Sequence, residues 1–147
     1  MSVITSGVFP CYENQFKIGA AGNSTPTNAI ADMEEYTLTI DNGIEEWNPF
    51  GEDGWKKRLM TAKAITIAAK GKRNIGDTGN DMVAEMAFKN GTEAQANFLW
   101  TFPDGSTLLL SNAVINVTAL NTAASTGVAP LEFEVQSNGK PTYTPAA

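Results

Sequence analysis

The side chains on which most enzymes and metal sites depend are scarce in this sequence. Its 147 residues include no histidine, the commonest general base and metal ligand, and a single cysteine, Cys11, cannot build a thiolate zinc site. The sequence contains no phosphate-binding glycine loop, nucleophile elbow or dinucleotide-binding fingerprint. We therefore expect no enzymatic activity, no catalytic residue, no cofactor and no bound metal.

Two groups of oxygen-bearing side chains remain as candidates for chemistry. Glu45-Glu46 and Glu52-Asp53 are adjacent pairs, which seldom form an acid/base dyad by themselves, so we interpret them as solvated surface. Asp77, Asn80 and Asp81 offer oxygens to a hard cation, but they lack the alternate spacing and later glutamate of a calcium-binding loop. Their position before an apolar run indicates helix capping instead.

The most distinctive chemistry lies between residues 43 and 59, which read GIEEWNPFGEDGWKKRL. Aromatic rings, acids and bases gather there, and the candidate binding residues are Glu45, Glu46, Trp47, Pro49, Phe50, Trp55, Lys56, Lys57 and Arg58. The rings fit two interpretations equally well: a satellite core under their own loop, or the anchors of an interface. A clamp for a ligand or a nucleic acid is a further alternative, because a ring beside a basic run can stack on a base.

The distribution of charge bears on that choice. A net charge of −6 opposes nucleic-acid binding, since such domains are normally basic. Seven of the ten basic residues lie within 56–73, whereas 41–54 holds five acids and no base. This asymmetry favours acidic-to-basic contacts between copies of the chain, because charge complementarity fixes register and partner choice.

Hydrophobic periodicity predicts the elements that position these residues. The expected strands are 36–40, 62–70, 96–102, 106–120, 131–136 and 141–144. A long loop over 42–60 joins the first two, and a helix is expected at about 80–90. Pro103-Asp104-Gly105 and residues 137–140 are turn sequences, so the last four strands should form two hairpins.

The predicted elements imply a mainly β protein, an antiparallel β-sandwich or partial barrel with one flanking α-helix. Residues 1–33 are expected to form an irregular N-terminal arm, with a short strand near 15–18, and residues 34–147 to form one domain. No apolar run approaches the ~20 residues of a membrane-spanning helix. The first residues lack the features of a secretory signal, so synthesis in the cytoplasm is expected.

Several stretches, taken in order, resemble one family. They are 41–47, 54–61, 71–77, Gly79-Asn80-Asp81, Trp100-Thr101-Phe102-Pro103 with Gly105, Asn116-Val117-Thr118, 130–135 and 137–143. Across about 35–144 the sequence is similar to the tail tube proteins (major tail proteins) of long-tailed bacteriophages and related phage-like particles. The resemblance implies a structural role in the virion (the phage tail), with assembly in the cytoplasm of the host bacterium.

The resemblance also implies a β-sandwich of the phage tail tube type that assembles into six-membered rings. The rings stack into a hollow tube that conducts the genome into the host, and the long loop contacts the adjacent ring. The implied partners are copies of the chain, the tail tip, the tail terminator, the tape measure protein during assembly, and DNA in transient non-specific passage. Glu132 and Glu134 alternate with apolar residues and are the candidates for the lumen. The alternative function is a soluble ligand- or nucleic-acid-binding β module.

Overall fold

The structure is a computed structural model that describes residues 3–146. Within this part of the chain, no helix is long and apolar enough to cross a membrane. The elements, in order, are η1 (Cys11–Glu13), β1 (Gln15–Ala20), β2 (Asn28–Ala29), β3 (Met33–Trp47), β4 (Lys57–Lys72), α1 (Thr78–Glu85), η2 (Met86–Phe88), η3 (Gly91–Ala94), β5 (Gln95–Thr101), β6 (Thr107–Leu120), β7 (Pro130–Gln136) and β8 (Thr142–Thr144).

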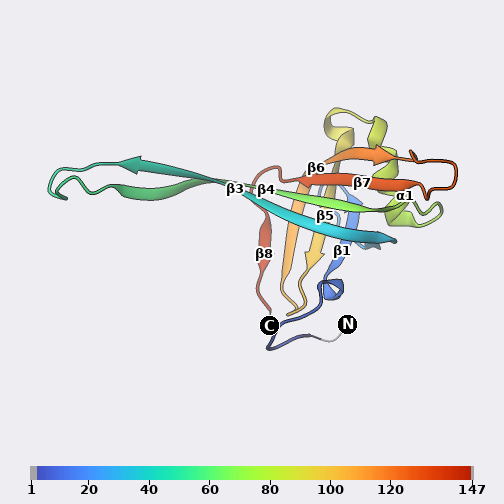
Figure 1. Ribbon diagram of the computed structural model, residues 1–147, viewed down its shortest axis with the longest axis horizontal. Helices are drawn as coiled ribbons and strands as arrows, with labels where there is room; N and C mark the ends of the chain where they lie inside the picture. Colours follow the sequence, from blue (N-terminus) through green and yellow to red (C-terminus); the bar gives the residue numbers. More distant parts are fainter. Residues whose placement is uncertain (1–2, 147) are drawn as a thin grey trace.

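All eight strands belong to one antiparallel sheet that bends at its central strand, β6. The order is β2-β1-β5-β6-β7-β4-β3, and β8 pairs with β6 outside this path. The first residues of β6 pair with β5 and β8, and its last residues pair with β7. In Figure 1, β3, β4 and β7 therefore run across the view while β1, β5 and β8 cross them steeply. The predicted sandwich or partial barrel with one flanking α-helix is confirmed.

The core fills the space between the two halves of the bent sheet. Strand β7 shows how the sequence produces it, because Leu131, Phe133 and Val135 are buried while the alternate residues remain partly exposed. Phe98 and Ile18 complete the core from the other half of the sheet, and both are fully buried. The sequence alternation that predicted these strands is thus the alternation between core and solvent.

The N-terminal region is less irregular than expected. Strands β1 and β2 join the sheet beside β5, and the short strand predicted near 15–18 is β1. The loop that follows β1 is held by Asn97, whose side-chain amide donates to the carbonyl oxygens of Gly22 (2.9 Å) and Ser24 (2.7 Å). Asn97 also accepts a hydrogen bond from the backbone N–H of Asn112 (2.8 Å). This buried amide connects the N-terminal region to the β5–β6 hairpin.

The loop predicted over 42–60 is wrong, because most of it is a β-hairpin. Strand β3 continues to Trp47 and β4 begins at Lys57, with pairing from Asn42↔Lys63 to Trp47↔Lys57. Asp41-Asn42-Gly43 has the residue types of a turn, but the register shifts between Gly43 and Ile44 and the strands continue through a bulge. A Cβ on Gly43 would lie 2.9 Å from that of Ala62, so close strand packing explains the glycine.

The expected pairing of the last two strands is also wrong. The β5–β6 hairpin across residues 102–106 is confirmed, but β8 pairs with β6 through Leu108↔Tyr143 and not with β7. The other edge of β7 is already occupied by β4, from Thr66↔Gln136 to Lys72↔Pro130. Residues 137–141 therefore carry the chain past β7 to the other half of the sheet.

The predicted helix exists but is shorter than the expected 80–90. Helix α1 spans Thr78–Glu85 and a 3-10 turn follows it. Asp77 caps its first turn by accepting a hydrogen bond from the backbone N–H of Asn80 (3.0 Å), which confirms the capping interpretation. The oxygens proposed for a cation accept hydrogen bonds from protein donors instead, as with Asp81 and Arg73 at 2.7 Å.

Candidate inter-subunit surfaces

A long hairpin projects from the body of the molecule. Strand β4 pairs with both β3 and β7 from Thr66 onward, but before that residue it has only β3 beside it. We call residues 41–64 the protruding hairpin, and Figure 1 shows it extending far from the rest of the fold. Its seven residues in β3, 41–47, span about 23 Å at ~3.3 Å per residue. Little of this segment can be stabilised by the core of its own chain.

The aromatic residues of this hairpin are exposed. The exposed fractions are 44% for Trp47, 106% for Phe50 and 77% for Trp55. Large aliphatic side chains accompany them, with Leu59 at 60% and Met60 at 45%. A satellite core is therefore the wrong interpretation of these rings, and a hydrophobic surface on an extended hairpin is typical of an interface.

An apolar stripe runs along one face of β3 and β4, from the body into the protruding hairpin. Successive side chains of a strand alternate between faces, so Leu38, Ile40 and Ile44 of β3 share the face that turns toward the core in the body. They are 40–50% exposed because the core ends before they do. Met60 lies opposite Ile44 across the bulge. These four residues are not among the candidate binding residues predicted from the sequence, although the alternation of Leu38 and Ile40 is visible there.

The charges of the hairpin are mostly paired within it. Glu46 contacts Lys56 (2.9 Å) and Arg58 (3.3 Å), and Glu52 contacts Lys57 (3.4 Å). Hydrogen bonds from Lys56 and then Arg58 hold the pKa of the Glu46 carboxyl below its usual range, so it stays ionised to lower pH. These pairs are exposed and each stabilises the hairpin little. The basic run is thus largely neutralised where it stands.

Glu132 and Glu134 lie on the face of β7 opposite the core. Lys70 of β4 stands beside Glu132, and Asn116 of β6 donates to the Glu134 carboxylate (3.1 Å), as does Gln136 (3.4 Å). Threonines extend the same face onto the neighbouring strands, with Thr66 on β4 and Thr37 and Thr39 on β3. The face is therefore polar and carries carboxylates that are partly exposed.

Two long stretches of strand edge have no strand beside them in the described part of the chain. Strand β3 ends the sheet, so its outer edge has no strand beside it from Met33 to Trp47. On β6, pairing with β5 stops at Gln95↔Val114, and residues 115–120 have a strand on the β7 side only. Unpaired N–H and C=O groups at such edges are templates for pairing with another chain.

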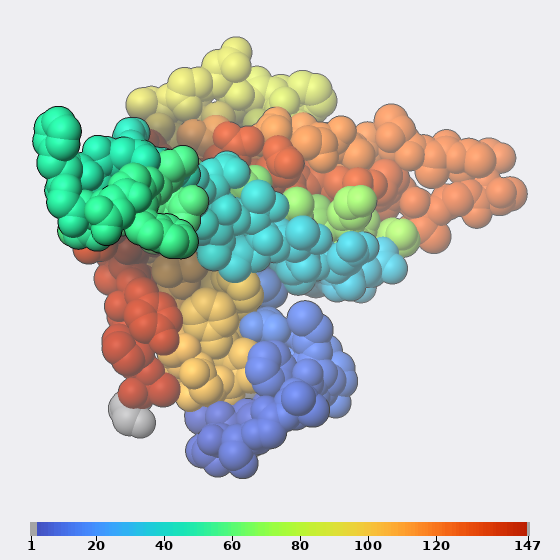
Figure 2. Space-filling view, turned by 60° about the vertical axis from the view of Figure 1, so that its left-hand side comes forward, coloured from blue at the N-terminus to red at the C-terminus, as the bar shows by residue number. Residues whose placement is uncertain are grey.

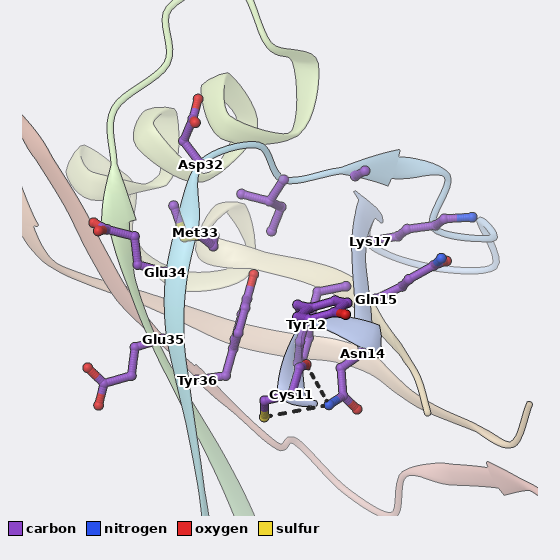
Figure 3. Close-up of a pocket in the computed structure, with 13 residues that line it drawn as sticks. Cys11, Tyr12, Asn14, Gln15, Lys17, Asp32, Met33, Glu34, Glu35 and Tyr36 are labelled. Carbon is purple, nitrogen blue, oxygen red and sulfur yellow. Dashed lines mark hydrogen bonds between the residues drawn. The ribbon is translucent and has the colours of Figure 1, made fainter. Parts of the chain in front are cut away.

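A groove lies between the N-terminal region and the start of β3 (Figure 3). Its volume is about 500 Å³, and the ring of Tyr36 stacks on Phe16 with centroids 3.6 Å apart. Burial raises the pKa of the Tyr36 hydroxyl, which therefore remains protonated. Glu34 and Glu35 point away from the groove, and the thiol of Cys11 accepts only a long contact from Asn14 (3.7 Å). The described residues of this groove form no acid/base pair, and the stack acts as packing between β1 and β3.

The structure brings together Glu45, Glu46, Trp47, Lys57 and Arg58 as facing residues of the paired strands. Pro49, Phe50, Trp55 and Lys56 belong to the segment 48–56 that connects the two strands, which we call the tip. In Figure 2 the tip stands forward on one side of the body, and the β6–β7 loop (121–129) stands out on the opposite side. Both ends of the molecule are thus formed by exposed connections.

Comparison with models of known families finds no match, and neither does comparison with curated proteins. The fold matches a chain from the tail of an empty GTA particle with C6 symmetry, at a TM-score of 0.72 and 15% identity, over 94% of this chain and 100% of that one. A chain from the virion of the native gene transfer agent particle matches at 0.69 and 15%, over 94% and 100%. The PVC sheath/tube terminator of an extracellular contractile injection system matches at 0.64 and 14%, over 97% and 100%. At sequence identities this low, the matches establish a shared fold and nothing further.

Proposed function

We propose that this chain is the subunit of a tail tube, in a long-tailed phage or a phage-like particle. The observation that carries the proposal is the shared fold over the whole length of a tail chain arranged with C6 symmetry. On this proposal the chain forms six-membered rings that stack into a hollow tube, and it has no catalytic role. Its partners are its own copies, a tail tip, a tail terminator and a tape measure protein. Its location is the virion, after assembly in the cytoplasm of the host bacterium.

The open strand edges support ring formation. The strand at each edge of a sheet is normally covered, short or charged, because its unpaired backbone groups otherwise recruit other chains. Here β3 offers one such edge, and residues 115–120 of β6 offer another across the same polar face. Pairing of β3 with β6 of the next copy would make one closed sheet from six copies, and closure would remove both of these edges.

The polar face supports the proposal of a conduit. In such a barrel the face with Glu132 and Glu134 would line the lumen, while the core side of the sheet stays covered by the other half of the fold. Like charge keeps DNA from adhering to a wall along which it must move. The net charge of −6 acts in the same direction.

The direct test of the proposed function is negative-stain electron microscopy of the purified protein. We expect six-fold rings and hollow tubes, with growth favoured at high protein concentration because assembly is governed by mass action. A small, fixed oligomer at every concentration would contradict the proposal and favour the ligand-binding module. Analytical ultracentrifugation of the same samples gives the mass of the species.

A second prediction concerns DNA. The protein should bind duplex DNA weakly and only at low salt, because an acidic surface gains nothing from counterion release. Replacing both Glu132 and Glu134 with lysine should increase binding by about tenfold or more at low salt in a gel-shift or fluorescence assay. The matched control is the same double substitution at Glu85 and Glu93, exposed acids outside this face. Tight binding by the unmodified protein at physiological salt would contradict the conduit.

A further inference from the structure

We propose that the tip of one copy docks in a groove at the root of the protruding hairpin of another copy. The groove is lined by Lys63, Ile65, Leu108, Lys140 and Pro141, with a volume of about 530 Å³. This inference rests on the proposed function in that it specifies how copies of the tube subunit recognise each other. It names a receptor surface for the tip.

The groove is apolar because it is an exposed end of the core. Ile65 and Leu108 are partly buried and pack against the core cluster, so their outer surfaces form a hydrophobic floor. Residues 137–141 form one wall, fixed to β4 by the Ser137 hydroxyl, which accepts from the backbone N–H of Ile65 (2.9 Å). The site is therefore built by ordered backbone and can receive an aromatic ring without rearrangement.

The groove is also positively charged. Lys63 donates to the neutral side chain of Asn42 (2.8 Å), and within the described residues neither Lys63 nor Lys140 lies in a salt bridge. None of the groove-lining residues is acidic. An occupant with an apolar ring and an adjacent carboxylate would satisfy both features.

The tip has this composition. Residues 48–56 contain Phe50 and Trp55, the most exposed rings of the hairpin, together with Glu52 and Asp53. Their one base, Lys56, is paired with Glu46 (2.9 Å). Glu52 is paired with Lys57, whereas Asp53 has no salt-bridge partner among the described residues. Asp53 is therefore the free carboxylate nearest the rings, and it complements Lys140 or Lys63.

The other grooves fit the tip less well. Those beside Tyr36 and beside Tyr143 include acids, namely Asp32 in the first and Asp104 in the second. A fourth groove is lined largely by polar residues and carries one base, Lys89. A tip cannot fold back on its own root groove, because paired strands of about 23 Å separate them. Docking must therefore be intermolecular, and contact between two different surfaces generates rings or filaments.

The test reverses charges on each side of the contact. Lys140→Glu alone and Asp53→Lys alone should each reduce the sedimentable tube fraction by about tenfold or more, because like charges then face each other. The protein carrying both substitutions should regain tubes, since the pair is restored with opposite polarity. Lys63→Glu provides a second groove variant, and Asp53→Asn removes the charge with a residue that tolerates the left-handed φ of +51° at this position.

The matched control is Lys17→Glu, which makes the same charge change in the groove beside Tyr36 and should leave tubes intact. Far-UV circular dichroism confirms that each variant is folded. Normal tubes from Lys140→Glu and Lys63→Glu, or no recovery in the double variant, would overturn the docking proposal while the tube function stands. Absence of rings and tubes in the unmodified protein would instead overturn the proposed function. A dimer that Lys140→Glu dissociates and the double variant restores would support docking without a tube.

Discussion

Replacing both Trp47 and Trp55 with alanine is expected to abolish stacked tubes while the domain stays folded. Both rings lie on the protruding hairpin and are largely exposed, so the substitutions create no cavity in the core. Aromatic residues at the centre of an interface contribute about 2 kcal/mol or more each to association. In the proposed six-membered assembly, this contribution would be lost at each of the six contacts between one ring of subunits and the next.

Electron microscopy and sedimentation measure the loss of tubes, and thermal unfolding by circular dichroism measures the fold. The control is Phe88→Ala, which removes a ring that is 88% exposed in the 3-10 turn after α1. It should leave both tubes and unfolding unchanged. If the double tryptophan variant melted at a clearly lower temperature and lost tubes for that reason, the rings would be stabilising the chain's own fold.

The sequence predicted the strands in which alternation coincides with burial. In β7, Leu131, Phe133 and Val135 face the core while Glu132 and Glu134 face solvent, so local pattern and tertiary position agree. The hairpin at Pro103-Asp104-Gly105 was predictable for a similar reason, since its turn chemistry is local, and Gly105 adopts a φ of +94°.

The protruding hairpin could not be predicted in the same way. Its strands pair only with each other beyond the body, so burial does not impose alternation on residues 41–47. Asp41-Asn42-Gly43 carries turn chemistry, yet the same residue types serve a bulge, and only the partner strand decides between them. The pairing of β8 with β6, and not with β7, could not be predicted for a related reason. The edge of β7 is occupied by β4, which comes from a distant part of the sequence.

The role of Asn80 was another feature that local reasoning missed. The sequence indicated helix capping, and Asp77 does cap α1, but the Asn80 side chain is fully buried. Its oxygen accepts from Arg73 (2.8 Å) and from the backbone N–H of Asn74 (3.0 Å). Its amide donates to the carbonyl oxygens of Ala31 (3.1 Å) and Lys72 (3.0 Å). One side chain thus joins the helix to the segments that lead into β3 and out of β4.

Replacing Asn80 with alanine should therefore lower the free energy of unfolding by roughly 3 kcal/mol. The variant leaves two carbonyl oxygens and one N–H buried without partners, and an unsatisfied buried group costs far more than a hydrogen bond contributes in net terms. Asn80→Leu should cost at least as much, because it fills the volume and satisfies none of the four partners. The Asn80 substitutions are made in the Trp47/Trp55 double-alanine variant, and urea unfolding measures their effect. This background forms no tubes, and tube assembly would otherwise raise the apparent stability.

The control is Asn90→Ala, at an exposed asparagine whose side chain makes no capping hydrogen bond. It should change the free energy of unfolding by less than about 0.5 kcal/mol. A small effect of Asn80→Ala would mean that water replaces the amide, and Asn80→Leu, which leaves no room for water, would then remain strongly destabilising. If neither variant were destabilised, Asn80 would not be what fixes α1 to the root of the β3–β4 hairpin, and the ends of that hairpin would be held by strand pairing alone.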